Sequence, residues 1–197
     1  MKFILIGLHG SGKHEIAHTL QEMGVKYGKN FTSVDLDLSK AYGEFEYYEN
    51  STVNDVFENN AFIFLHEHQG KEIPSSYKYF EGLSKYTFDN NDVFVMSPNQ
   101  FLSIPANNMP DDVVWVWLDN TKTNRSNRYK MEKRSYDFMD REDLEKQDIK
   151  EFVKALYNVQ DLKLLYFTNE DPARVATIIY YIQMHPDLLN HFIKNFN

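Results

Sequence analysis

The sequence has no cysteine among its 197 residues, so it can form neither a disulfide framework nor a thiolate zinc site. Proline and glycine are scarce, with six and eight copies, and no proline-rich linker, repeat or low-complexity tract divides the chain. A chain of this length can bury one sizeable core, and we therefore expect a single domain over residues 1–197. The lack of cysteine is compatible with a reducing compartment, and we expect a cytoplasmic protein.

Positive charge and long apolar runs are lacking as well. The formal net charge is −8, whereas a nucleic-acid surface needs clustered lysines and arginines, so we expect no nucleic-acid partner. No window approaches the roughly 18 apolar residues that span a bilayer, and the apolar start at residues 1–8 is typical of a buried strand. We therefore expect no membrane association. The sequence leaves open whether the protein forms a homodimer.

The chain does contain strand-like segments that alternate with helical ones. Short apolar runs typical of buried parallel strands lie at residues 2–6, 31–36, 92–96, 113–118 and 164–167. Helical patterns lie at residues 13–23, at residues 121–157 with a break near 135–139, and at residues 171–184. This alternation predicts a three-layer, doubly wound α/β fold with a parallel sheet.

One long segment, residues 37–88, fits the alternation poorly. It is rich in tyrosine, asparagine and glutamate, and its periodicity is mixed. We interpret it as a small inserted lobe that covers a ligand. The alternative is an irregular surface excursion.

The strongest motif joins the first apolar run to the first helical pattern, and reads Gly7-Leu8-His9-Gly10-Ser11-Gly12-Lys13. In such a loop the backbone amides wrap phosphates, the glycines permit the tight path and the lysine neutralises the outer phosphates. The expected nucleotide-binding residues are Gly7, Gly10, Ser11, Gly12, Lys13 and His14. The alternative is a glycine-rich turn without a ligand.

His14 departs from this motif, which has serine or threonine at that position to bind Mg²⁺ through a hydroxyl. Imidazole is a poor ligand for this hard ion, which prefers oxygen. Two hypotheses remain. Magnesium is held through water and the phosphates alone, or the loop binds nucleotide and catalyses slowly.

Further short motifs follow in order, namely Gly43-Glu44, Phe62-Ile63 before Gly70, Asp92-Val93 before Gln100, Arg134-Ser135-Tyr136-Asp137 and Thr168-Asn169-Glu170-Asp171. With the loop, they resemble the guanylate kinase branch of the nucleoside monophosphate kinases over nearly the whole chain. The resemblance implies a P-loop fold with an acceptor-binding lobe at about 37–88 and an arginine-rich lid at about 125–145. It also implies phosphoryl transfer from ATP, with Mg²⁺, to a nucleoside monophosphate, and it places Asn169 near the adenine. A phage-type deoxynucleotide kinase fits the same pattern.

The sequence also departs from that family on the acceptor side. Leu38 and Ala41 stand where the family has two arginines that clamp the acceptor phosphate, and Phe64 stands where it has the glutamate that reads guanine. Met96 and Pro98 replace acidic residues at the end of the third expected strand. The acceptor base and sugar therefore stay open.

Phosphoryl transfer needs positioning and positive charge around the moving group, and the expected lid is rich in arginine. Arg125 and Arg128 share a helical face. We expect Arg128 and Arg134 to clamp the ATP phosphates and Arg141 to reach the transferred group. The expected catalytic residues are Lys13, Arg128, Arg134 and Arg141. The alternative is a solvated helix whose charges pair locally, such as Arg141 with Glu145.

Candidate acceptor-binding residues lie in and around the expected lobe. Two aspartates follow the second expected strand, where ligands bind in open α/β sheets, and tyrosines can stack on a base. The candidates are Asp35, Asp37, Lys40, Tyr48, Tyr79 and Ser84. For the aspartates the alternative is a solvated loop start, and for the tyrosines it is packing. His66 and His68 lack a third ligand, and we expect no metal site there.

Three functional hypotheses follow from the sequence. The first is an active kinase that uses ATP to phosphorylate a nucleoside monophosphate. The second is a catalytically degenerate nucleotide-binding protein of the same fold that acts through a protein partner. The third is another P-loop phosphotransferase that acts on a nucleoside or a small metabolite.

Overall fold

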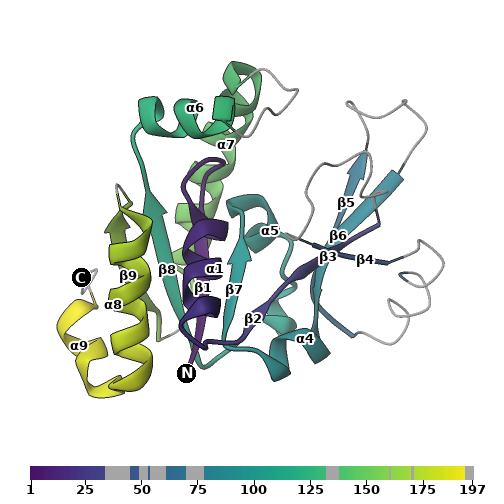
Figure 1. The fold of residues 1–197 in the computed structure, drawn as a ribbon. Coiled ribbons are helices and arrows are strands. Elements are labelled where there is room, and N and C mark those ends of the chain that lie inside the picture. The colour runs from purple at the N-terminus through teal and green to yellow at the C-terminus, as the bar shows by residue number, and fades with distance from the viewer. Residues whose placement is uncertain are drawn as a thin grey trace.

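The central element of the fold is a parallel sheet of five strands. The structure is a computed structural model that describes residues 1–33, 45–48, 53, 61–69, 78–131, 138–159, 161–169 and 171–193. The strands in spatial order are β2 (Tyr27–Gly28), β7 (Val93–Met96), β1 (Lys2–Gly7), β8 (Val113–Asp119) and β9 (Lys163–Thr168). Every neighbouring pair in this sheet is parallel, which confirms the predicted α/β fold with a parallel sheet (Figure 1).

Helices cover both faces of this sheet, because successive strand residues point to opposite sides. Phe3 and Leu5 belong to one core cluster, together with residues of α1 (Lys13–Glu22) and α8 (Pro172–Met184). Ile4 and Ile6 belong to the other, together with residues of α5 (Pro98–Leu102) and α7 (Phe138–Leu156). The strands therefore lie in the middle of three layers, as predicted.

The helices begin and end close to the predicted positions. The charged stretch at 121–157 contains α6 (Lys122–Met131) and α7. Of the expected break near 135–139, residues 135–137 lie outside the described residues and residues 138–139 belong to α7. At α8, Pro172 is the first helical residue, and the Asp171 carboxylate accepts the Arg174 N–H at 3.2 Å. Across the described residues, no helix is both long and apolar enough to cross a membrane.

A second sheet forms in the region of the expected lobe. Its strands in spatial order are β4 (Phe45–Tyr47), β3 (Asn30–Thr32), β6 (Lys78–Ser84) and β5 (Phe62–Gln69). The β3–β6 and β6–β5 pairs are antiparallel, and the β3–β4 pair is parallel. Phe31, Val53 and Phe62 form a separate buried cluster, so this sheet has an apolar core of its own. In Figure 1 it lies beside the β2 edge of the central sheet.

The predicted second strand at 31–36 does not belong to the central sheet, because residues 30–32 form β3 of the second sheet, and residues 34–36 lie outside the described residues. The strand of the central sheet is β2, at Tyr27–Gly28, and the chain then passes into the second sheet at Asn30. The Asn30 side-chain amide donates to the Val95 carbonyl of β7 at 2.9 Å. This bond occupies a backbone acceptor on β7 just beyond the last β2 pair, so the main chain can leave the sheet there.

The remaining described elements are short, namely α4 (Lys85–Asn90), η1 (Ala106–Asn108), η2 (Pro186–Leu188) and α9 (Leu189–Phe192). At α4, the Lys2 ammonium group donates to the carbonyls of Phe88 and Asn91, the latter at 2.7 Å. A cation at the carboxyl end of a helix is favourable, and this contact joins the first strand to α4.

Candidate functional site

The predicted phosphate loop lies between the end of β1 at Gly7 and the start of α1 at Lys13. Gly10 and Gly12 have φ angles of +73° and +86°, which favour glycine. A Cβ atom added at Gly10 would lie 2.8 Å from the Arg125 carbonyl oxygen, and one added at Gly12 would lie 2.0 Å from Arg128 Nη1. The two glycines therefore serve both the backbone conformation and the close approach of α6, which lies above this end of β1 in Figure 1.

Lys13 is the first residue of α1, and its side chain is held inside the loop. Its ammonium group donates to the carbonyls of Gly7 at 2.7 Å and Leu8 at 2.9 Å, and the residue is only 8% exposed. The loop thus brings a fixed cation to the amino end of a helix at the carboxyl edge of the sheet. Such an arrangement favours anionic ligands.

Arg128 on α6 supplies a second cation at this loop. Its Nη1 atom lies 3.5 Å from Glu15 Oε2, and this buried nitrogen has no hydrogen-bond partner within the described part of the chain. Arg125, one turn earlier, has its backbone against Gly10 and is only 5% exposed. The expectation that Arg125 and Arg128 share one helical face agrees with this geometry. Arg134 lies outside the described residues, and of Arg141 only the backbone, in α7, is described.

Asn169 supports the loop through a side-chain hydrogen bond. It is fully buried, its side-chain amide donates to the Ser11 carbonyl, and its backbone N–H donates to the Asp119 carbonyl at 2.7 Å. The Asn120 side-chain amide in turn donates to the Asn169 carbonyl at 2.7 Å. Through these hydrogen bonds, Asn169 connects the carboxyl ends of β8 and β9 to each other and to the loop. The expected position of Asn169 near an adenine stays a prediction. The structure shows a different contact, in which the Asn169 side chain holds the loop at Ser11.

Asn120 is a residue that sequence reasoning missed, and Asp119 is another. Asp119 ends β8, and its carboxylate accepts the Tyr166 hydroxyl at 2.7 Å. This hydrogen bond, with smaller contributions from burial and from the negative charge of Asp119, raises the pKa of Tyr166 to about 12. Polar residues at the ends of neighbouring parallel strands share one edge of the sheet. This sequence signal could have identified both Asp119 and Asn120.

The described residues offer no group of ligands that fits a magnesium ion held by the protein. His14 Nδ1 lies 3.2 Å from the Tyr27 hydroxyl on β2. The position that carries a hydroxyl in this motif therefore holds an imidazole that is hydrogen-bonded to Tyr27. At the end of β7, the Ser97 hydroxyl accepts the Gln100 N–H at 3.2 Å as the cap of α5. Among the described side chains, no group of three His, Asp or Glu residues could hold a metal ion.

The second sheet reaches the loop end of α1, since the ring centroids of His14 and Phe45 are 6.4 Å apart. Two polar contacts join this sheet to α5 and its carboxyl end. Gln100 Nε2 donates to Glu81 Oε2 at 3.1 Å, and His66 Nδ1 lies 2.8 Å from the Ser103 hydroxyl oxygen. Sequence reasoning missed both contacts, because their partners are far apart in the chain.

The expected acceptor residues are dispersed in what the structure describes. Tyr48 stacks on Phe31 with 4.9 Å between centroids, and burial, followed by the charge of Glu46, raises the pKa of its hydroxyl. The Ser84 hydroxyl accepts the Thr87 N–H at 3.0 Å as the cap of α4. Tyr79 is half-buried on β6. Asp35, Asp37 and Lys40 lie outside the described residues, as do Leu38, Ala41 and Gly70.

Phe64, which the sequence resemblance alone puts at the guanine-reading position, is fully buried in the core cluster that also holds Ile4 and Phe94. Met96 is equally buried at the end of β7. Neither side chain is available to a ligand. The sequence departures at these positions are therefore core residues.

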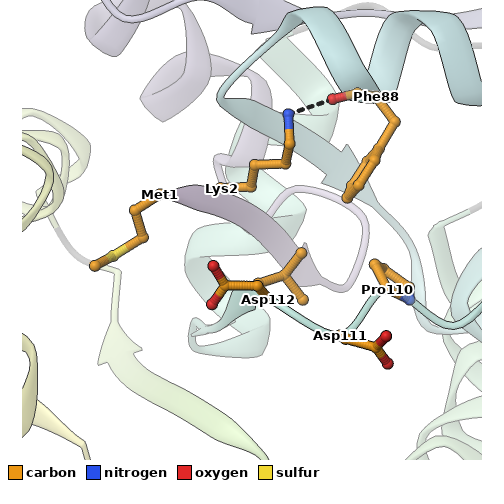
Figure 2. Close-up of a pocket in the computed structure, with 7 residues that line it drawn as sticks. Met1, Lys2, Phe88, Pro110, Asp111 and Asp112 are labelled. Carbon is orange, nitrogen blue, oxygen red and sulfur yellow. Dashed lines mark hydrogen bonds between the residues drawn. The ribbon is translucent and has the colours of Figure 1, made fainter.

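A hollow of about 280 Å³ lies at the opposite end of the sheet. Figure 2 shows it between the start of β1, the segment before β8 and the end of α4, with Met1, Lys2, Phe88 and Asp112 on its walls. The phosphate loop follows the other end of β1, so this hollow is separate from the candidate site. Asp112 beside it pairs with Lys163 at 2.8 Å, which lowers the pKa of this carboxyl group.

No protein-family model matches the sequence, and no curated protein matches it. Among solved structures, the chain is similar to a guanylate kinase from Anaplasma phagocytophilum, with a TM-score of 0.56 and 16% identity over 99% of this chain and 87% of that one. A deoxyadenosine kinase from M. mycoides with bound dATP scores 0.46, at 14% identity over 93% and 99% of the two chains. A shikimate kinase from Aquifex aeolicus scores 0.42, at 15% identity over 95% and 99%. At 16% identity the likeness to the guanylate kinase structure shows a shared fold and nothing further.

Proposed function

We propose that this protein is a phosphotransferase that moves the terminal phosphoryl group of ATP to a nucleoside monophosphate. The observation that carries the proposal is the loop itself. Lys13 is enclosed at the amino end of α1, next to two glycines with positive φ, and Arg128 approaches the same loop from α6. Two cations and a helix amino end at one point are suited to bind phosphates and to stabilise charge during transfer.

Each residue has a part in this proposal. Lys13 neutralises the outer phosphates, and Arg128, whose Nη1 lies 3.5 Å from Glu15 Oε2, contacts them from α6. Asn169 and Asn120 hold the loop in shape. Arg134 stays a candidate for clamping the ATP phosphates, and Arg141 for reaching the transferred group. Magnesium, when present, would come bound to the phosphates, since the described residues offer it no fitted ligand set.

The acceptor is proposed to bind between the phosphate loop and the second sheet, which lies next to His14 through Phe45. Lys40, Asp35, Asp37 and Tyr79 remain the candidates for acceptor contacts, whereas the hydrogen bonds of Ser84 are those of a helix cap. A guanylate or deoxynucleoside monophosphate is the proposed class. The protein is proposed to be cytoplasmic.

A second function, nucleotide binding without turnover, is favoured by one observation. The imidazole of His14 is bonded to Tyr27 where a metal-binding hydroxyl is usual. A protein of this kind would act through a protein partner that recognises the nucleotide-bound form.

One experiment separates these functions. The protein is incubated with ATP labelled on the terminal phosphate and magnesium, across all ribo- and deoxynucleoside monophosphates, with the matching uncharged nucleosides as a second panel. Label on a monophosphate acceptor supports the proposal. Label only on nucleosides indicates instead a P-loop phosphotransferase that acts on nucleosides. ATP binding in calorimetry without transfer to any acceptor would favour the binding protein.

A further inference from the structure

His14, the residue after the loop lysine, packs against the central sheet through Tyr27. His14 Nδ1 lies 3.2 Å from the Tyr27 hydroxyl, and Tyr27 is 7% exposed on β2 of the central sheet. One turn later on α1, the ring of His18 lies edge-on to the same tyrosine ring, with 5.5 Å between centroids. His14 is thus a packed side chain with a nitrogen where the motif has a metal-binding oxygen.

The nearby carboxylates of the described chain have other partners. Glu15 on α1 faces Arg128, and Asp119 at the end of β8 accepts the Tyr166 hydroxyl. The end of β7 offers Met96, which is buried, and Ser97, whose hydroxyl caps α5. The described residues at this edge therefore leave no free carboxylate among those named for Mg²⁺, which requires oxygen ligands.

The positive charge at the loop comes from protein side chains rather than from a metal ion. Lys13 donates to the Gly7 carbonyl, and Arg128 Nη1 would lie 2.0 Å from a Cβ added at Gly12, so both cations are at the loop. A bound magnesium ion would compete with them for the same phosphate oxygens. We propose that the loop takes a nucleoside triphosphate as the metal-free anion and binds it at least as tightly when magnesium is chelated as when it is present. This inference rests on the proposed nucleotide site and concerns the form of the nucleotide that the site selects.

The test is calorimetric titration of ATP into the full chain, once with excess EDTA and once with excess magnesium. The expected result is an affinity in EDTA that equals or exceeds the affinity in magnesium. Any clear loss of affinity on chelation would overturn the inference and leave the proposed function intact. No binding in either buffer would overturn both, because the nucleotide site itself would be absent.

Two variants locate the cause. His14→Thr restores the hydroxyl of the motif, and we expect its ATP affinity in magnesium to exceed that in EDTA by about tenfold, the effect of one strong interaction with a charged group. His18→Thr is the matched control, since it makes the same exchange one turn along α1 beside the same Tyr27 ring, and it should behave as the wild type. A His14→Thr protein that folds, by circular dichroism, and shows no gain with magnesium would contradict the assignment to His14.

Discussion

Replacing Gly12 by alanine tests how the loop and α6 fit together. Gly12 has a φ of +86°, and forcing alanine into this conformation costs about 1–2 kcal/mol. The added Cβ would also lie 2.0 Å from Arg128 Nη1 and 2.6 Å from Asn169 Nδ2. Arg128 can move away cheaply, but displacing the buried Asn169 amide from the Ser11 carbonyl costs a further ~1–3 kcal/mol.

Gly24 supplies a matched control. Its φ is +93°, so alanine there has the same backbone penalty, yet no described atom lies within 4 Å of the added Cβ. We expect Gly24→Ala to lower the free energy of unfolding by about 1–2 kcal/mol, and Gly12→Ala by roughly 2–5 kcal/mol.

The two variants are compared by urea unfolding and by calorimetric titration with ATP. Gly24→Ala should bind ATP as the wild type does, whereas Gly12→Ala should lose most of its affinity because Arg128 and the loop amides are displaced. Wild-type affinity in Gly12→Ala, or equal destabilisation by the two changes, would refute this account of the loop.

Three further predictions concern residues around the site and its supports. Asn169→Ala leaves the Ser11 carbonyl without its donor, and we expect a loss of ~1–3 kcal/mol in unfolding free energy together with weaker ATP binding; unchanged binding in calorimetry would contradict a supporting role. Asn30→Ala removes the bond to Val95, and a loss of similar size should appear in urea unfolding while ATP binding persists, since neither partner of this bond belongs to the loop. Tyr166 has its pKa raised from 10.0 to about 12, so its hydrogen bond to Asp119 stabilises the fold fully below pH 10 and is lost as pH rises towards 12. The stability advantage of wild type over Tyr166→Phe should therefore shrink across that interval, and an advantage independent of pH would exclude this cause.

The parts of the fold that the sequence predicts well are those set by local pattern. The runs at 2–6, 92–96, 113–118 and 164–167 are apolar enough to be buried on both faces, and all four became strands of the central sheet. The phosphate loop was predicted because its glycines and Lys13 have a fixed spacing. Both signals lie within a few neighbouring residues and need no knowledge of tertiary contacts.

What the sequence could not predict depends on contacts between distant residues. The run at 31–36 looked like a strand of the central sheet, but the side-chain bond from Asn30 to Val95 marks the point where the chain leaves it. Asn120 gave no local signal, since its role appears only when β8 and β9 are placed side by side. Ser84 was a candidate ligand residue from its position alone, and its hydrogen bonds show it as a helix cap.

The central claim is that Lys13 acts within a phosphoryl-transfer site. The most direct test is transfer of labelled phosphate from ATP to the best acceptor of the panel, by wild type and by Lys13→Met, which keeps the buried side-chain stem. We expect transfer by the wild type and a loss on the order of a hundredfold or more in the variant, as for removal of one stabilising donor in an active site. Thermal unfolding would check that the variant keeps its fold. Undiminished transfer by a folded Lys13→Met protein, or no transfer by the wild type to any acceptor, would contradict the claim.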